Sequence, residues 1–184
     1  MTVLALDLAT KAGWALHSSG SAAPIFGTLD LRDAPGQVGS AMEKLRVAMA
    51  ALQRENGPIR WVFVEQQHLA GSGNLNSLKK LIALNAMAEW VSFSIGAQIR
   101  EVNILQWRQH FLGKAPQRIK NGRKVSTWDR ATAKAAALRV CALYGWDVAD
   151  SDDAAEAAGI LDFACSLLPD HVRPWRDRLL MRGG

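Results

Sequence analysis

Thr2-Val3-Leu4-Ala5-Leu6-Asp7-Leu8-Ala9 is the stretch that decides the fold. Apolar residues occupy both sides of its alternation, which is typical of a strand buried on both faces inside an α/β sheet. One carboxylate, Asp7, interrupts the apolar run. A buried carboxylate needs strong hydrogen-bond donors, a cation or a bound metal beside it. From this stretch alone, backbone N–H groups of the following turn explain Asp7 as well as a functional site does.

Hydrophobic periodicity and breaker residues predict the other elements in the order β-β-β-α-β-α-β-α-α. Strands are expected over 13–17, 25–31, 61–65 and 98–102, and helices over 38–52, 74–93, 128–144 and 152–168, with a helical turn over 104–112 and a loop over 113–126. This order predicts an α/β fold with a five-stranded mixed sheet and helices on both faces, in one domain over 1–184. The helix over 74–93 is apolar on most sides, which indicates burial or a subunit contact.

Crossover connections would place the first and fourth strands side by side and parallel. The fourth strand, Trp61-Val62-Phe63-Val64-Glu65, is also apolar and also ends in a carboxylate. We therefore expect Asp7 and Glu65 to face one site from neighbouring strands.

Composition indicates a protein without a membrane span. No apolar run in the 184 residues is long enough to cross a bilayer, and no basic-then-apolar leader precedes the first strand. The two cysteines, Cys141 and Cys165, show no metal-ligand or redox spacing. A reduced, cytoplasmic setting is the simplest expectation.

The net charge of +5 is unevenly distributed along the chain. Between Gln106 and Arg139 there are nine lysines and arginines against one acid, whereas Asp147 to Asp170 holds seven acids and no lysine or arginine. A basic segment next to an acidic one indicates a polyanionic partner beside a cation-binding cluster.

Asp150, Asp152, Asp153 and Glu156 provide four acids at the start of the last predicted helix. Asp153 and Glu156 are three residues apart and share a helical face. Acids in a first helical turn are also favoured by the helix dipole, and Asp150 or Ser151 serves as a helix cap. Such capping accounts for one or two of these acids, but less well for four.

Asp7, Glu65, Asp153 and Glu156 together would put about four negative charges around one pocket, too many to stay ionised without compensation. Two Mg²⁺ ions about 4 Å apart would neutralise them, since Mg²⁺ selects oxygen ligands. Such a pair activates water for attack on a phosphodiester, and the basic segment would hold the phosphate backbone. This combination predicts a nuclease.

The opening Leu6-Asp7-Leu8-Ala9 with Gly13-Trp14, the strand end Val64-Glu65-Gln66 and the helix start Asp153-Ala154-Ala155-Glu156-Ala157 resemble the RuvC-type Holliday junction resolvases of the ribonuclease H-like superfamily. The resemblance extends in order and spacing to about residue 168. It implies a homodimer that nicks four-way DNA junctions symmetrically with Mg²⁺ or Mn²⁺. It also implies catalytic positions at Asp7, Glu65, Asp153 and Glu156, with a basic residue on the preceding helix at Lys134.

The chain departs from the family pattern in several places, as a divergent branch carried by a phage or prophage would. Leu8-Ala9 replaces the usual Pro-Gly, Glu156 replaces the usual last Asp, and Asp152 takes the place of Asp153 if the helix starts one residue later. Where the family often has an aromatic wedge, this chain has His68. The predicted DNA-binding residues are His68, Arg108, Lys114, Arg118, Lys120, Arg123, Lys124 and Arg130. Trp107 and Trp128 are candidates for groove-lining residues or for core packing.

Three other functions fit parts of the pattern. A nuclease of the same fold acting on other branched DNA or on RNA–DNA hybrids shares all four acids. An actin-like ATPase shares the opening hairpin but needs a duplicated domain and a second Gly-rich phosphate loop, which this chain lacks. A catalytically inactive DNA-binding module would lack one of the acids, and none is missing.

Overall fold

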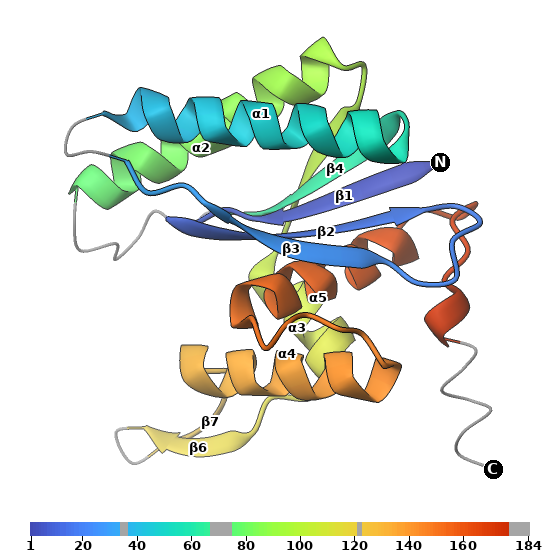
Figure 1. Ribbon diagram of the computed structural model, residues 1–184. Coiled ribbons are helices and arrows are strands. Elements are labelled where there is room, and N and C mark those ends of the chain that lie inside the picture. Colours follow the sequence, from blue (N-terminus) through green and yellow to red (C-terminus); the bar gives the residue numbers. More distant parts are fainter. Residues whose placement is uncertain (34–36, 67–74, 121–122, 177–184) are drawn as a thin grey trace.

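The structure is a computed structural model that describes residues 1–33, 37–66, 75–120 and 123–176. Its elements are β1 (Thr2–Asp7), β2 (Lys11–Ser18), β3 (Ile25–Asp30), α1 (Val38–Asn56), β4 (Ile59–Glu65), α2 (Leu75–Ser94), β5 (Gln98–Val102), α3 (Ile104–Leu112), β6 (Gln117–Lys120), β7 (Arg123–Ser126), α4 (Arg130–Tyr144) and α5 (Asp152–Ser166). Figure 1 shows α1 and α2 on one side of the sheet and α3, α4 and α5 on the other.

The main sheet has five strands in the order β3-β2-β1-β4-β5. β1 pairs antiparallel with β2 and parallel with β4, and β4 pairs parallel with β5. β1 is therefore interior, and Val3, Leu4, Ala5 and Leu6 are fully buried, as their apolar run predicts. The predicted five-stranded mixed sheet with helices on both faces is confirmed.

Two hydrophobic cores lie on opposite faces of the sheet. Leu4 and Leu6 of β1 point into the core that α1 and α2 cover, whereas Val3 and Ala5 point into the core around α5. This alternation follows from the two-residue period of a strand. From Ala154 to Leu161, every residue of α5 is buried, because the helix lies between the sheet and the α3–α4 layer.

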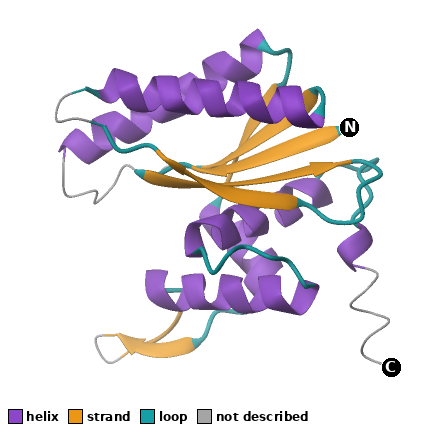
Figure 2. Cartoon of the chain, viewed as in Figure 1, coloured by secondary structure: helices purple, strands orange, loops and turns teal. Residues whose placement is uncertain are grey.

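Three predicted elements are corrected by the structure. The segment 113–126, expected to be a loop, contains the antiparallel hairpin β6–β7, which lies apart from the main sheet beyond α4 (Figure 2). The expected helical turn over 104–112 is the helix α3, capped by the Asn103 side chain, which accepts from the Leu105 N–H. The helix expected from Trp128 begins at Arg130, with Asp129 as its N-cap.

Candidate active site

Asp7 and Glu65 end adjacent parallel strands at the same level. The β1–β4 register pairs Leu6 with Val64, so Asp7 and Glu65 are the next residues on both strands. The carboxyl ends of parallel strands meet at one edge of a sheet, where ligand sites of open α/β sheets lie. The expected neighbouring position of these two acids is confirmed.

Helix α5 begins directly over this edge because β2 has a glycine there. Gly13 pairs with Asp7, and a Cβ built on Gly13 would lie 1.9 Å from the backbone oxygen of Asp153. Any other residue at this position would push the helix away from the sheet. The chain turns into α5 through Ala149 and Asp150, both with positive φ, and Ser151 caps the helix by accepting from the Ala154 N–H.

Asp7 lies within electrostatic reach of all three other acids. Burial, together with the charges of Glu65, Glu156 and Asp153, raises the pKa of Asp7 to about 8, whereas the Lys134 ammonium acts in the opposite direction. The structure therefore brings the four predicted carboxylates together from β1, β4 and α5.

Lys134, on α4, is the cation that the structure places against these acids. Its Nζ lies 2.8 Å from Asp152, 2.9 Å from Asp153 and 3.8 Å from Glu156. Burial works against the charge of Lys134, but the hydrogen bonds to Asp152 and Asp153 outweigh it and raise the pKa of the amine. Lys11 of β2 adds a second amine 3.8 Å from Asp153.

Among the clustered acids Asp152, Asp153 and Glu156 of α5, Glu156 is the most enclosed, with 5% of its surface exposed. Burial raises the pKa of its carboxyl, whereas Arg108, Lys134 and Arg130 act to lower it. Arg108, on α3, donates to Glu156 at 2.9 Å, and its side chain is 12% exposed. Arg108 thus belongs to the acid cluster, and Arg130 stands near it at the start of α4.

Trp107 makes a direct contact with one of the acids, which was not expected from the sequence. Its indole N–H donates to Glu65 at 2.7 Å, and the side chain is fully buried. Gly159 of α5 makes room for it, since a Cβ there would lie 2.8 Å from the Trp107 ring. Its burial excludes a groove-lining role. The available signal for this role was a tryptophan with polar neighbours just before the basic loop. Its partner Glu65, however, lies 42 residues away in the sequence.

The structure separates Asp152 from Asp153. Both lie in the first turn of α5, but the Asp152 side chain is 40% exposed and the Asp153 side chain 13%. The charge of Asp153 is one of the causes that raise the pKa of Asp7. Asp153 is therefore the acid of this turn that faces β1, and Asp152 flanks the cluster through Lys134.

These residues fit a divalent cation of the Mg²⁺ class. The donors that converge are carboxylate oxygens, which such ions select. Burial and the three neighbouring acids raise the pKa of Asp7, and a cation among the carboxylates would favour its charged form.

The predicted DNA-binding residues fall into three groups. Lys114 and Arg130 are exposed, Arg130 lies near enough to Glu156 to act on the pKa of its carboxyl, and Arg108 is bound to Glu156. Arg118, Lys120, Arg123 and Lys124 lie on the β6–β7 hairpin, and their side chains are outside the described structure. His68 also lies outside the described residues. Lys114 and Trp128 line a pocket of about 400 Å³ between α3 and the hairpin.

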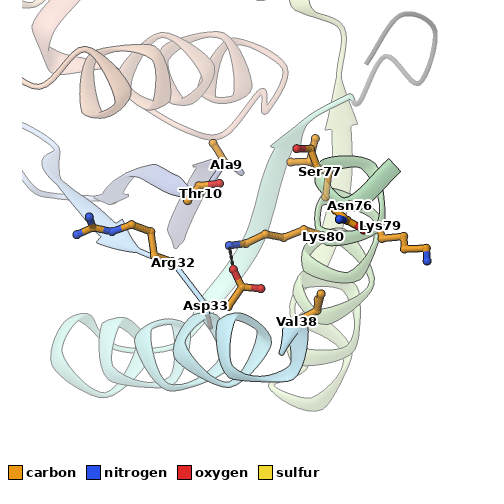
Figure 3. Close-up of a pocket in the computed structure, with 10 residues that line it drawn as sticks. Ala9, Thr10, Arg32, Asp33, Val38, Asn76, Ser77, Lys79 and Lys80 are labelled. Atoms are coloured by element: carbon orange, nitrogen blue, oxygen red, sulfur yellow. Dashed lines mark hydrogen bonds and ion pairs between the residues drawn. The ribbon is translucent and has the colours of Figure 1, made fainter. Parts of the chain in front are cut away.

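A larger pocket, of about 660 Å³, is lined by residues that start two positions after Asp7 in the sequence. Ala9 and Thr10 line it on one side and the first turns of α2 on the other (Figure 3). Lys80 is largely buried there and bonds Asp33 at 2.6 Å, while Arg32 and Lys79 stand at opposite sides. The pocket wall thus carries more positive than negative charge next to the acid cluster.

The strand order and the helices on both faces of the sheet define an α/β protein with a ribonuclease H-like fold. No family model matches the chain, and no curated protein matches it. Solved structures share its fold. Thermus thermophilus RuvC in complex with a Holliday junction substrate aligns with a TM-score of 0.64 and 13% identity, over 91% of this chain and 97% of that one. Another structure of Thermus thermophilus RuvC aligns at 0.62 with 14% identity, over 91% and 96%.

The expected resemblance to RuvC is therefore confirmed at the level of the fold. With sequence identities of 13% and 14%, the likeness is one of fold. Among the described residues, no helix has both the length and the apolar character needed to span a bilayer.

Proposed function

We propose that this protein is a metal-dependent endonuclease that resolves four-way DNA junctions by paired, symmetric nicks. The whole of residues 1–184 would act as one ribonuclease H-like domain. The observation that supports this most is the convergence of Asp7, Glu65, Asp153 and Glu156 at one edge of a RuvC-like sheet, where burial and the other three acids raise the pKa of Asp7.

In this proposal the four acids hold Mg²⁺ or Mn²⁺, two ions per site. Bound there, such ions supply an activated water and offset the charge of the leaving 3′-oxygen. Asp7, rigid on an interior strand, sets the position of the scissile phosphate. Trp107 and Arg108 fix the rotamers of Glu65 and Glu156, each by a direct hydrogen bond.

Lys134 takes the role of the basic catalytic residue. Its ammonium holds Asp152 and Asp153 and lies 3.8 Å from Glu156, so it stands at the mouth of the same cluster. A cation in that place would stabilise the negative charge that develops on the phosphate during attack.

The DNA backbone would cross the acid edge and the basic residues on either side of it. Lys114, Arg130 and the hairpin residues Arg118, Lys120, Arg123 and Lys124 supply positive charge on the α3–α4 side, and Arg32 and Lys79 supply it at the larger pocket. His68 would contact bases near the junction centre. The neighbouring RuvC structure is described with a Holliday junction, which favours junctions over linear duplex.

A homodimer would place two such sites on one junction. Helix α2 supports this because Trp90 and Phe93 expose 56% and 84% of their surface. A monomer rarely leaves large neighbouring aromatics in water without a binding use. Both cysteines are free and buried, which fits a reduced, cytoplasmic setting.

The decisive experiment compares cleavage of a synthetic four-way junction with cleavage of linear duplex, flap and RNA–DNA hybrid, each with and without Mg²⁺. We expect Mg²⁺-dependent, symmetric nicks in the junction. Asp7→Asn should abolish cleavage and leave junction binding intact or tighter, because repulsion of the phosphate falls. Preferential cutting of the hybrid or flap would favour the alternative ribonuclease H-like substrate. Full cleavage by the Asp7→Asn variant would refute the site.

A further inference from the structure

Three metal-ligating side chains meet inside the protein away from the carboxylates. His17 lies on β2, Cys165 near the end of α5, and His171 in the segment that follows α5. All three are buried, with 1%, 1% and 5% of their surface exposed. One possible ligand atom from each residue lies within 4.8 Å of those from the other two.

The hydrogen bonds at this cluster fix which ring nitrogens face inward. His17 Nε2 lies 3.0 Å from the Ser21 carbonyl oxygen, which can only accept, so Nε2 carries the hydrogen and Nδ1 has a lone pair. His17 Nδ1 lies 2.7 Å from His171 Nε2. The other nitrogen of His171 lies 3.3 Å from the Ser19 hydroxyl.

This is the arrangement of metal-binding imidazoles. Each ring has its outer nitrogen oriented by an oxygen and its inner nitrogen turned toward the shared centre, as the outer hydrogen bonds of metal-bound histidines do. The Ser19 hydroxyl can donate or accept, so His171 can take the tautomer that frees Nε2 for an ion.

We propose that His17, Cys165 and His171 form a binding site for Zn²⁺ or a similar thiophilic divalent ion. A set of two imidazoles and a thiolate suits Zn²⁺, whereas Mg²⁺ requires oxygen ligands. Two nitrogens bound to a tetrahedral ion at about 2.0–2.1 Å lie about 3.4 Å apart. The inner nitrogens therefore need to separate by roughly 0.7 Å from their hydrogen-bonded distance. The fourth position is left to a water molecule on the side of Ser19 and Ser21, whose hydrogen bonds are only partly buried.

The ion would fasten the segment after α5 to the sheet. The Trp175 ring packs edge-on against His17 at 4.7 Å, and its N–H donates to Asp162 of α5 at 2.7 Å. Cys165 lies twelve residues after Asp153 on the same helix, about 18 Å along its axis. The site is thus separate from the acid cluster, and it does not depend on the proposed nuclease activity.

Cobalt titration tests the site without any activity assay. Protein with reduced thiols is stripped of metal and titrated with Co²⁺, which gives a thiolate-to-cobalt charge-transfer band only where a cysteine binds it. We expect one equivalent to produce the band, Zn²⁺ to abolish it and Mg²⁺ to leave it unchanged. Cys165→Ser should lose the band and weaken Zn²⁺ binding by at least about tenfold. Cys141→Ser, the matched control at the other buried cysteine, should keep both.

The outcome does not depend on the folding of one variant. The chain has two cysteines, so a band that persists in Cys141→Ser assigns the thiolate to Cys165 even if Cys165→Ser fails to fold. Absence of the band in the folded parent protein, or its loss in Cys141→Ser with the fold intact by circular dichroism, would overturn the proposal. The histidines would then be a hydrogen-bonded pair only.

Discussion

At the scale of single residues, Asp7 makes the metal-free protein sensitive to pH. Its pKa in the folded protein is about 8, above the ordinary value of 3.8. The folded state therefore keeps a proton that the unfolded chain releases above about pH 4. The contribution of Asp7 to the free energy of unfolding should therefore fall as the pH rises from about 4 to about 8, and a cation bound among the acids would offset this loss.

Asp7→Asn should remove that dependence. In the presence of a chelator, we expect the free energy of unfolding of the variant to rise relative to that of the parent protein as the pH rises from 5 to 8. The expected gain is up to roughly 1.4 kcal/mol per pH unit. Urea unfolding at each pH measures the difference. Asp33→Asn is the control. Lys80 lowers the pKa of Asp33, so loss of the Asp33 carboxylate should destabilise the protein. Parallel pH curves for Asp7→Asn and the parent protein would contradict the raised pKa.

Trp107 and Trp175 offer a matched pair for the role of the indole at the acid cluster. Both are buried, and each donates its N–H to a carboxylate at 2.7 Å, Trp107 to Glu65 and Trp175 to Asp162. Trp107→Phe should lower cleavage by about 10–100-fold and raise the Mg²⁺ requirement, because Glu65 loses its orienting donor. Trp175→Phe should cost similar stability, roughly 1–3 kcal/mol, with cleavage close to that of the parent protein. Equal cleavage by the two variants would rule out this role.

At the scale of elements, the contact between β2 and α5 sets the spacing of the acids. Gly13→Ala would place a methyl group against the Asp153 backbone, so α5 must shift. We expect a loss of roughly 1–3 kcal/mol in stability and a fall in cleavage of about 100-fold, the effect of a misplacement near 1 Å. Gly39→Ala on α1, where an added Cβ meets nothing within 4 Å, should leave cleavage unchanged. A Gly13→Ala protein with full activity would show that α5 does not need this close approach.

The β6–β7 hairpin carries the charge expected to meet DNA. Arg123→Gln with Lys124→Gln should weaken junction binding and reduce the slope of log affinity against log salt by roughly 1–2. Arg54→Gln with Arg60→Gln removes the same charge near the start of β4, opposite the acid edge, and should leave the slope unchanged. Binding measured by fluorescence anisotropy across a salt series separates the two. An unchanged slope in the hairpin variant would show that the β6–β7 hairpin does not contact the DNA.

These elements also show how far the sequence leads. The apolar runs around Asp7 and Glu65 predict two interior strands, and their parallel pairing follows from the chain order, so two of the acids could be placed together. The hairpin was missed because its strands lack apolar alternation, although Asn121-Gly122 between them is a strong hairpin signal. The bond from Trp107 to Glu65 and the meeting of His17 with Cys165 depend on side chains brought together only by packing, which no local pattern encodes.

At the scale of the whole molecule, α2 presents apolar side chains on two faces. Leu84, Ala88 and Val91 are buried in the core with α1 and the sheet. Ile82 and Phe93 are exposed at 52% and 84%. These exposed positions fall on one side of the helix, as their helical spacing requires. Trp90 and Phe93 also line a pocket of about 490 Å³ with Ala97 and Ile99 at the β5 edge.

Phe93→Glu should therefore separate the homodimer that we propose into monomers, because it places a charge in an apolar contact. Val47→Glu, an exposed apolar position on α1, is the matched control and should leave the dimer intact. Analytical ultracentrifugation measures the oligomeric state. Cleavage of a plasmid with an extruded cruciform shows whether the two nicks are coordinated. Two coordinated nicks linearise the plasmid, whereas a lone site leaves nicked circles. We expect the Phe93→Glu protein to shift the product from linear to nicked circles; a linear product from a monomer would show that one chain makes both cuts.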